Sequence, residues 1–577
     1  MNRRYLKYLF TSILGGALAS CGGGGGGGPA PAPAVPIVGS LSPDCTGVNC
    51  GAINANSYSG TGIGFWRYNN TSSSVATVDV NIAGVAAGNV ATLIFSNGSD
   101  ATASSPTAGT LASPVMPPAD VAGLRFSPEV IAAQQHSSQD DAHAQMLERN
   151  RSIAARLISN RPAIGPAADL SNAIPAAATR LLFTPALGAT KTWFDTFPAT
   201  SVAYDTSVQN VCPVPSGRKV VWWVDPTIVS SGKFTAGELK TALDAMQVSY
   251  CGSAGSAGGL AQLNGLLGDV WGADPNKRPE LIKDATGALQ DINVVVLNVP
   301  AGTGWAGYFS GGNNFMKSAV SSSNEALAFF INASQIKTDV NFATSTLLHE
   351  STHMVNFYQR TVVRGVLHDT WLEETSAMMT EDIVSPAVIP AGAVGYNKVL
   401  SIRLPDYQRK GGNVSYINWP TLADATPNYA IGGGFGAFLN RRYGLSIYQQ
   451  LVTACTDGTQ SAPALTSYVC LDGLIKTNGG SSFSDEFARF GATVFGQLPA
   501  TGMPAGYGYP ATVAGSYALQ AKDLSSPLSF VAAAPLGAGY TATSHTYQRD
   551  TVAAGTTSYV RNAVVVPANT TLIVIIK

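Results

Sequence analysis

The residues with the clearest chemical meaning are two histidines four positions apart, with a glutamate directly after the first. They stand in the run His-Glu-Ser-Thr-His over residues 349–353, inside a segment, 341–360, whose pattern predicts a helix. Residues four apart lie about 40 degrees apart around a helix axis, so both imidazoles can reach one metal ion. The spacing therefore predicts that His349 and His353 bind zinc. Glu350 faces a neighbouring side, from which its carboxylate can act as general base on a water molecule.

A catalytic zinc site of this kind needs a third protein ligand and leaves one position open for water. Two glutamates, Glu373 and Glu374, follow His353 by 20 and 21 positions (373 − 353 and 374 − 353), at the start of a second predicted helix. They differ by about 100 degrees around that helix, so only one can face the metal. Spacing alone leaves both open. Both could also be solvated acids that the helix dipole favours at an N-terminus.

The two segments together resemble the gluzincin pattern, and their context is similar to the hyicolysin family of neutral zinc metallopeptidases. In that family the second block reads Trp-Leu-Asn-Glu, and Trp371-Leu-Glu-Glu374 is similar to it. The resemblance therefore assigns the third ligand position to Glu374. Further similar segments are Gly307-Tyr-Phe309, Ser323-Asn-Glu325, Phe330-Ile-Asn332, Tyr429-Ala-Ile-Gly432 and Arg442-Tyr-Gly444. The resemblance covers about residues 212–490 and implies one catalytic zinc ion and a protein or peptide substrate.

The resemblance also indicates how negative charge on the substrate oxygen would be stabilised. Tyr429 begins a Tyr-x-x-Gly segment similar to that of related aminopeptidases, and we expect it to be the oxyanion donor; Tyr358 and His545 are weaker alternatives. The Gly-x-Met-Glu-Asn segment with which those aminopeptidases capture a free amino terminus is absent. This favours an endopeptidase. An aminopeptidase and a non-catalytic surface binding or adhesion protein on a peptidase-like scaffold are the alternatives.

Other residues near these segments are expected to position the site. Zinc-bound imidazoles usually donate their second ring N–H to a carboxylate, and Asp369, Glu381 and Asp382 are all near enough in sequence. The choice among them stays open, and His368 is expected in a loop. Residues 326–331 predict a strand just before the metal helix. We expect it to be the sheet edge that pairs with an extended substrate, although an ordinary core strand fits equally well.

The elements around the site predict an α+β fold: a zincin-like metallopeptidase core over residues 211–500, flanked by β-rich modules. Within the core, 219–224 and 291–297 are predicted strands, and Thr235 with Glu238 forms a capping box that begins a helix. The flanking segments are a β-rich N-terminal domain over 39–117 and a C-terminal β-rich module over 501–577. Residues 118–210 are predicted to be a helical linker, with its helix in 128–161, followed by a β-rich segment; together they are a candidate propeptide.

The first residues have the pattern of a lipoprotein signal peptide. Over residues 1–20 a basic start precedes an apolar stretch and small residues, and Cys21 follows at the expected point of cleavage and lipidation. A Gly-rich and Pro-rich tether follows over 21–38. We therefore expect an exported protein held at a bacterial cell envelope by a lipid anchor, at the outer membrane where the cell has one. The formal net charge of -1 and the low share of charged residues, 12%, give no basis for binding nucleic acid.

Six further cysteines remain, an even number that is typical of disulfides in an exported chain. Proximity in sequence favours three pairs, Cys45 with Cys50, Cys212 with Cys251 and Cys455 with Cys470. Free buried thiols are the alternative. No Cys-x-x-Cys pair occurs, which argues against a cysteine zinc site.

Overall fold

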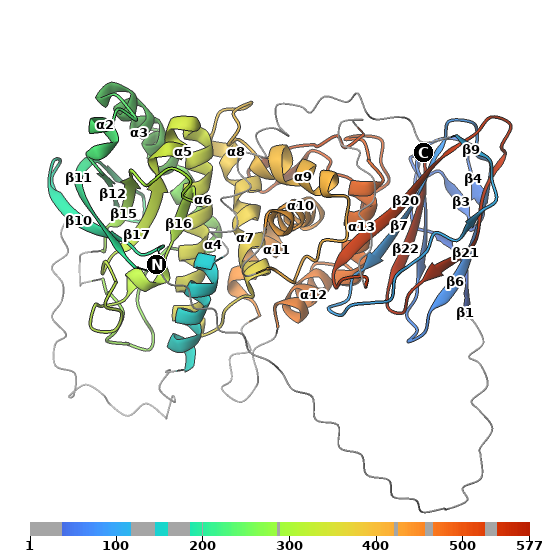
Figure 1. Cartoon of the computed structure of the whole chain (residues 1–577), viewed down its shortest axis with the longest axis horizontal. Coiled ribbons are helices and arrows are strands. Elements are labelled where there is room, and N and C mark those ends of the chain that lie inside the picture. Colours follow the sequence, from blue (N-terminus) through green and yellow to red (C-terminus); the bar gives the residue numbers. More distant parts are fainter. Residues whose placement is uncertain are drawn as a thin grey trace, which may run out of the picture.

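The structure is a computed structural model that describes residues 37–116, 145–159, 185–198, 200–284, 289–420, 425–455, 466–525 and 539–577. The predicted signal peptide, Cys21 and nearly all of the predicted tether therefore lie outside the described residues. Across the ranges that the structure describes, there is no helix with the length and apolar character needed to cross a membrane. Figure 1 shows three parts along the long axis: a sheet with helices, a central group of helices and a pair of packed sheets.

The first part is built on one mixed sheet. Its described strands run, in spatial order, β10 (Thr190–Asp195), β11 (Val202–Pro213), β12 (Lys219–Val224), β15 (Ile292–Leu297), β17 (Leu327–Asn332) and β16 (Gly307–Phe309). The strands β12, β15 and β17 are parallel, as expected for apolar runs buried on both faces. The β-rich segment predicted near the end of 118–210 is thus no separate unit, because β10 and β11 extend this sheet.

The edge of this sheet next to the metal helix is β16, and the expectation that residues 326–331 form the edge is wrong. β17 pairs with β15 on one side and with β16, which runs antiparallel, on the other. All six residues of β17 are buried, which an interior strand requires. The chain reaches β16 before β17, so the edge strand lies about 20 residues earlier than the one the sequence favoured.

Helices cover this sheet and form the central part of the molecule. Their bounds are α2 (Thr227–Ser230), α3 (Ala236–Cys251), α4 (Gly259–Leu267), η1 (Gly311–Asn314), α5 (Ala333–Thr338), α6 (Val340–Asn356), η2 (Phe357–Arg364), α7 (Thr370–Ile383), α8 (Ser385–Val388), η3 (Val399–Arg403), α9 (Leu404–Lys410), α10 (Thr426–Tyr443), α11 (Leu445–Thr453), α12 (Ser467–Thr477) and α13 (Phe483–Phe495). The predicted capping box of Thr235 and Glu238 begins α3. Residues 145–159 also form a helix, drawn in cyan in Figure 1, within the segment predicted to be helical.

The third part is a β-sandwich to which both flanking segments contribute. One sheet holds β1 (Ile37–Gly39), β3 (Ala52–Asn54), β4 (Ser57–Tyr58), β6 (Ala76–Ala83), β21 (Ser558–Val566) and β8 (Thr110–Leu111). The other has the order β2 (Ser42–Pro43), β5 (Gly64–Asn69), β22 (Thr571–Ile576), β7 (Val90–Asn97), β20 (Ser544–Val552) and β9 (Val115–Met116). Blue and red strands therefore alternate in Figure 1. The two β-rich modules expected from the sequence are one structure, because strands of each complete the sheets of the other.

Two short hairpins complete the described strands. They are β13 (Gly252–Ser253) with β14 (Ser256–Ala257), and β18 (Thr512–Ala514) with β19 (Tyr517–Leu519). All three predicted disulfides are present, between Cys45 and Cys50, Cys212 and Cys251, and Cys455 and Cys470. The second joins β11 to the end of α3, and the third joins the segment after α11 to α12.

Charged groups attach the sandwich to the helical part. Asp44 forms an ion pair with Arg67 of β5 at 2.8 Å and another with Arg489 of α13 at 2.8 Å. Arg67 also pairs with Asp485 of α13. Each of these side chains is largely buried, so the network fixes α13 against the sheet that contains β5, β22 and β7.

Candidate metal centre

Helix α6 carries the two histidines of the candidate centre. Its N-terminus is capped by Asp339, whose carboxylate accepts hydrogen bonds from the backbone N–H groups of Asn341 (2.8 Å) and Phe342 (2.9 Å). From Phe342 to Asn356 every residue of α6 is buried, because α6 lies between the sheet and α3, α4 and α7. His349 and His353 stand one turn apart on the side that faces α7.

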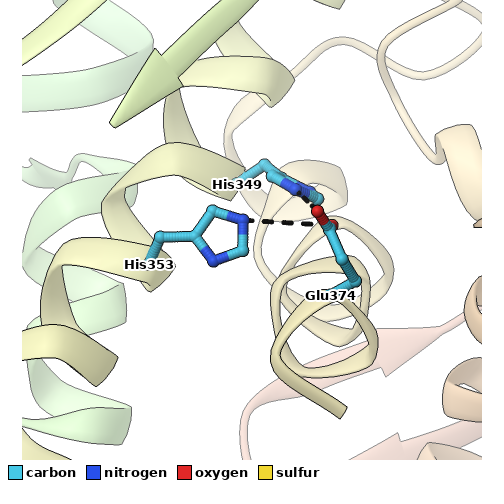
Figure 2. A group of neighbouring side chains, drawn as sticks. All are labelled: His349, His353 and Glu374. Carbon is cyan, nitrogen blue, oxygen red and sulfur yellow. Dashed lines mark ion pairs between the residues drawn. The ribbon is translucent and has the colours of Figure 1, made fainter. Parts of the chain in front are cut away.

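Helix α7 supplies the carboxylate that completes the group. One ligand atom from each of His349, His353 and Glu374 lies within 4.8 Å of the others. Oε2 of Glu374 is 3.0 Å from Nε2 of His349 and 3.9 Å from Nε2 of His353, as Figure 2 shows. All three residues are buried. Of the two glutamates that the spacing left open, Glu374 is therefore the one that faces both imidazoles.

Two further carboxylates lie behind the imidazoles. Glu373 accepts from Nδ1 of His353 at 3.0 Å, and Asn356 donates to the same glutamate oxygen at 3.0 Å. Glu381 lies 3.1 Å from Nδ1 of His349 and pairs with the buried Lys398 at 2.6 Å. Carboxylates in these positions orient the rings so that both Nε2 atoms point to one place.

Of the three carboxylates suggested by sequence as partners of the imidazoles, only Glu381 has this role. Asp369 pairs with Arg151 at 2.7 Å, and Asp382 pairs with Arg441 at 2.8 Å. A spacing rule could have identified Glu381, since it follows Glu374 by seven positions (381 − 374) and so lies two turns along the same face of α7. Nothing in the sequence pointed to Lys398.

The electrostatics of the group fit a divalent cation. Burial alone would lower the pKa of His349, but the carboxylates of Glu374 and Glu381 outweigh it and raise that pKa to about 9. Burial likewise opposes the charge on Glu381, yet Lys398 and His349 lower its pKa to about 2. Two imidazole nitrogens and a carboxylate oxygen are the donor set of catalytic zinc sites. The surplus of negative charge around the rings therefore favours a positive ion at the point where they converge.

Glu350 lies beside the group and is held by the edge strand. The backbone N–H of Phe309 in β16 donates to its Oε2 at 2.9 Å, and the side chain is buried. A residue of a β-strand directs its N–H and C=O to the same side, so both groups of Phe309 face away from β17. The general-base candidate is therefore in direct contact with the outer edge of the sheet.

Tyr429 of α10 also reaches the group, although through Glu374. Its hydroxyl donates to Oε1 of Glu374 at 2.6 Å, and the guanidinium of Arg403 lies over its ring at 5.0 Å. The two alternatives for the oxyanion donor have partners elsewhere: Tyr358 donates to the carbonyl of Ala273, and His545 bonds to Tyr407 and Phe487. His368 lies in the loop before α7, as expected, and contacts the carbonyl of Leu451.

The fold and the site define an α+β protein of the peptidase class, in which two adjacent helices bring two histidines and a glutamate to one buried point. The chain belongs to the Peptidase M30 family, whose sequence pattern matches residues 202–577, in agreement with the hyicolysin-type resemblance. A domain of unknown function, DUF8571, matches residues 43–109. No curated protein matches the chain. The M30 match includes β20, β21 and β22, so the three C-terminal strands of the sandwich lie within the family match.

Proposed function

We propose that the protein is a zinc-dependent endopeptidase, with His349, His353 and Glu374 as metal ligands and Glu350 as general base. One observation carries the proposal: the ligand atoms of these three residues lie within 4.8 Å of one another. Glu350, which directly follows His349, is also buried. Membership of a peptidase family supplies the reaction class. The alternative, a binding protein that has lost catalysis, has less support because each residue the reaction needs is present.

The chain's own residues divide the reaction among them. A zinc ion bound there would supply Lewis-acid chemistry, polarising a carbonyl and lowering the pKa of water. Glu350 accepts the proton of the attacking water and delivers it to the nitrogen of the leaving amine, so one carboxylate serves both proton transfers. Glu373 and Glu381 hold the imidazoles in orientation. Tyr429, through its hydroxyl, either anchors Glu374 or turns to donate to the developing oxyanion.

An extended substrate would lie along β16. The outward C=O of Phe309 and the N–H of Gly311 can form the hydrogen bonds of an added strand, and Glu350 accepts from the N–H of Phe309 beside them. Such pairing recognises backbone on both sides of the cleaved bond. It therefore suits internal peptide bonds better than a free amino terminus.

The location of the protein is part of the same proposal. A lipid anchor at Cys21 and a tether would hold the enzyme at the cell envelope, where a protein or peptide is the substrate. The three disulfides support an oxidising compartment, since such bonds persist outside the cytosol. Labelling with a radioactive or clickable fatty acid tests this: Cys21→Ser should abolish incorporation, and unchanged labelling would contradict it.

The proposed activity is tested with internally quenched peptides blocked at both ends. The zinc-loaded protein should cleave them, a chelator should stop cleavage, and Glu350→Gln should lower the rate at least about 1,000-fold while zinc remains bound. The control is Glu238→Gln, the same change at an exposed glutamate of α3, where glutamine keeps the capping box. Cleavage only of peptides with a free amino terminus would show an aminopeptidase instead. Bound zinc without any cleavage would favour the binding-protein alternative.

A further inference from the structure

The helix of residues 145–159 packs against the candidate active site with one side. Its buried residues are Met146, Leu147, Asn150, Ala154 and Leu157, whose spacing of three or four places them on one face. Most positions between them, such as Ser152, are exposed. Near the middle of the helix, Arg151 pairs with Asp369, the residue just before α7, at 2.7 Å. The helix therefore packs with one defined face at a defined position beside α7.

The contact at the centre of this face is made by Asn150. Its side-chain N–H donates to the carbonyl of Phe309 at 2.8 Å, and its side-chain oxygen accepts from the backbone N–H of Gly311 at 2.8 Å. An asparagine side chain ends in the same amide group as a peptide bond. With Phe309 of the edge strand and Gly311, the first residue of η1, Asn150 thus forms the pair of hydrogen bonds that a neighbouring peptide backbone would form.

These two backbone groups belong to the edge that the substrate would need. Phe309 is the residue whose N–H contacts Glu350, so Asn150 occupies the carbonyl of the same residue. A second strand cannot bind this carbonyl and the Gly311 N–H while Asn150 does. The helix and an extended substrate are therefore mutually exclusive at Phe309.

The cavity between the helix, Phe309 and His353 is too small for a peptide. Leu147 and Ala154 of the helix enclose a cavity of about 50 Å³ together with Phe309, His353 and Glu373. That volume accommodates a few water molecules, not an extended chain. The helix therefore lines this cavity beside His353 and also contacts the edge strand.

We propose that the 145–159 helix is an intramolecular inhibitor, which occupies the backbone-binding groups of Phe309 and Gly311 and must leave before a peptide substrate binds. The proposal rests on the endopeptidase function proposed above. Its sequence position agrees, since the helix precedes the Peptidase M30 match, which begins at residue 202. Removal by simple truncation is excluded as a test, because strands β1 to β9 precede the helix and complete the sandwich.

Point variants of the full chain test the amide contact. Asn150→Asp keeps an acceptor for the Gly311 N–H but places a carboxylate oxygen against the Phe309 carbonyl. We expect about tenfold faster cleavage of blocked peptides, and about tenfold tighter binding of a fluorescent extended peptide measured by anisotropy in the Glu350→Gln background. The control Ser152→Ala changes an exposed residue of the same helix and should leave both quantities unchanged. Equal rates and affinities for Asn150→Asp and Ser152→Ala would overturn the proposal.

Release of the helix tests the proposal without depending on one side chain. Recognition sites for a sequence-specific protease are introduced within 118–143 and within 161–184, and the chain is cut at both after folding. Cleavage of blocked peptides should rise at least tenfold, and a synthetic 145–159 peptide should reverse the rise. The Asn150→Asp form of that peptide should inhibit at least tenfold more weakly. An unchanged rate after both cuts would contradict the proposal.

A binding measurement separates this proposal from the proposed function. Labelled 145–159 peptide is bound to the doubly cut protein and challenged with unlabelled extended peptides. Displacement without cleavage by any variant would reject the endopeptidase function and retain the helix as occupant of the peptide-binding edge. Cleavage by the cut protein without displacement would retain the function and reject the helix as inhibitor.

Discussion

Four glutamates surround two imidazoles at the candidate centre, and what each contacts decides its role. Glu374 faces both Nε2 atoms, Glu373 and Glu381 lie behind the rings, and Glu350 contacts the backbone of the edge strand. The adjacent residues Glu373 and Glu374 have different roles because a helix turns by about 100 degrees between them. In the proposed function, chemically identical side chains thus divide into ligand, orienting group and base.

Substitutions of the adjacent glutamates should separate the ligand from the orienting residue. We expect Glu374→Gln to lose zinc binding almost entirely, because a neutral amide replaces the anionic ligand. Glu373→Gln should weaken zinc binding only about 10-fold to 100-fold, because His353 loses an orienting carboxylate and keeps its own nitrogen. Competition with a chromogenic chelator measures both affinities. A larger loss of zinc affinity for Glu373→Gln than for Glu374→Gln would make Glu373 the ligand and Glu374 the orienting residue.

The buried Lys398 should matter for stability although it is no ligand. Lys398→Met leaves the carboxylate of Glu381 buried without its cation, and we expect a loss of about 3–5 kcal/mol in the free energy of unfolding. Lys240→Met is the control, because Lys240 and Asp244 form an exposed pair whose loss costs below about 1 kcal/mol. Urea unfolding of both variants gives the comparison, and equal losses would contradict the expectation.

Much of the site was predictable, and the remainder depends on contacts between distant segments. The helical period relates His349 to His353, and the Trp-Leu-x-Glu resemblance selects Glu374. Only the packing of α6 against α7 shows which carboxylate is behind each ring. Asn150 lies about 200 residues before the metal helix, and no local pattern in the sequence connects an asparagine to a distant backbone carbonyl.

At the scale of elements, the position of Glu374 depends on how closely α7 approaches α10. A Cβ at Gly436 of α10 would lie 2.9 Å from Cγ of Met379 and 3.1 Å from Cγ2 of Thr375. Thr375 directly follows Glu374, so the glycine lets α10 support the turn of α7 that carries the ligand. The metal centre is therefore held by helix packing beyond its own side chains.

Exchanging glycine for alanine should show this dependence. Gly436→Ala overpacks the contact, and we expect a loss of about 1–3 kcal/mol in the free energy of unfolding together with weaker zinc binding. The same exchange at Gly473 of α12, where a Cβ meets nothing within 4 Å, should instead stabilise the protein by about 0.5–1 kcal/mol. Thermal unfolding and chelator competition measure the pair. A neutral result at Gly436 would show that α7 can shift freely.

The bounds of the elements were predictable from the sequence, but the pairing of each strand with its neighbours was not. Strands expected at 219–224 and 291–297 are found at Lys219–Val224 and Ile292–Leu297, since apolar β-branched runs between turns determine them locally. The edge position was assigned to the wrong strand because edge and interior are decided by pairing. An apolar run such as β17 has the same sequence pattern whether it forms an edge strand or an interior strand.

At the scale of the whole molecule, the sandwich is joined to the helices through buried polar contacts that include His545 of β20. Its Nδ1 bonds to the hydroxyl of Tyr407 in α9 at 2.8 Å, its Nε2 to the carbonyl of Phe487 in α13 at 2.9 Å. Burial lowers the pKa of His545 to about 3, against an opposing effect of the Phe487 carbonyl. The neutral imidazole is therefore part of the contact between α9, α13 and the sandwich.

This residue predicts a dependence of stability on pH. In the unfolded chain the pKa is near 6.5, so below that pH the unfolded state binds a proton that the folded state excludes. The free energy of unfolding should fall as pH decreases from 6.5 toward 3, by about 2 kcal/mol at pH 5 from this group. His545→Asn should be less stable at pH 7, and its difference from the natural protein should shrink at pH 5. His368, whose pKa is also lowered, acts equally in both proteins, so a constant difference would contradict the assignment.

The interleaved strands of the sandwich also determine the order in which parts of the protein can fold during synthesis. In the sheet β2, β5, β22, β7, β20, β9, the strand β22 lies between β5 and β7, and Asn69 bonds to Thr571 across a sequence separation of 502 residues. During synthesis β5 and β7 emerge early and keep unpaired edges until β22 arrives to fill the gap between them. So high a contact order makes closure a late and slow folding step, with apolar edges exposed to aggregation meanwhile. A chain stopped before residue 571 contains His349, His353 and Glu374 and still lacks the strand between β5 and β7, so these three residues can be present while the sandwich is incomplete.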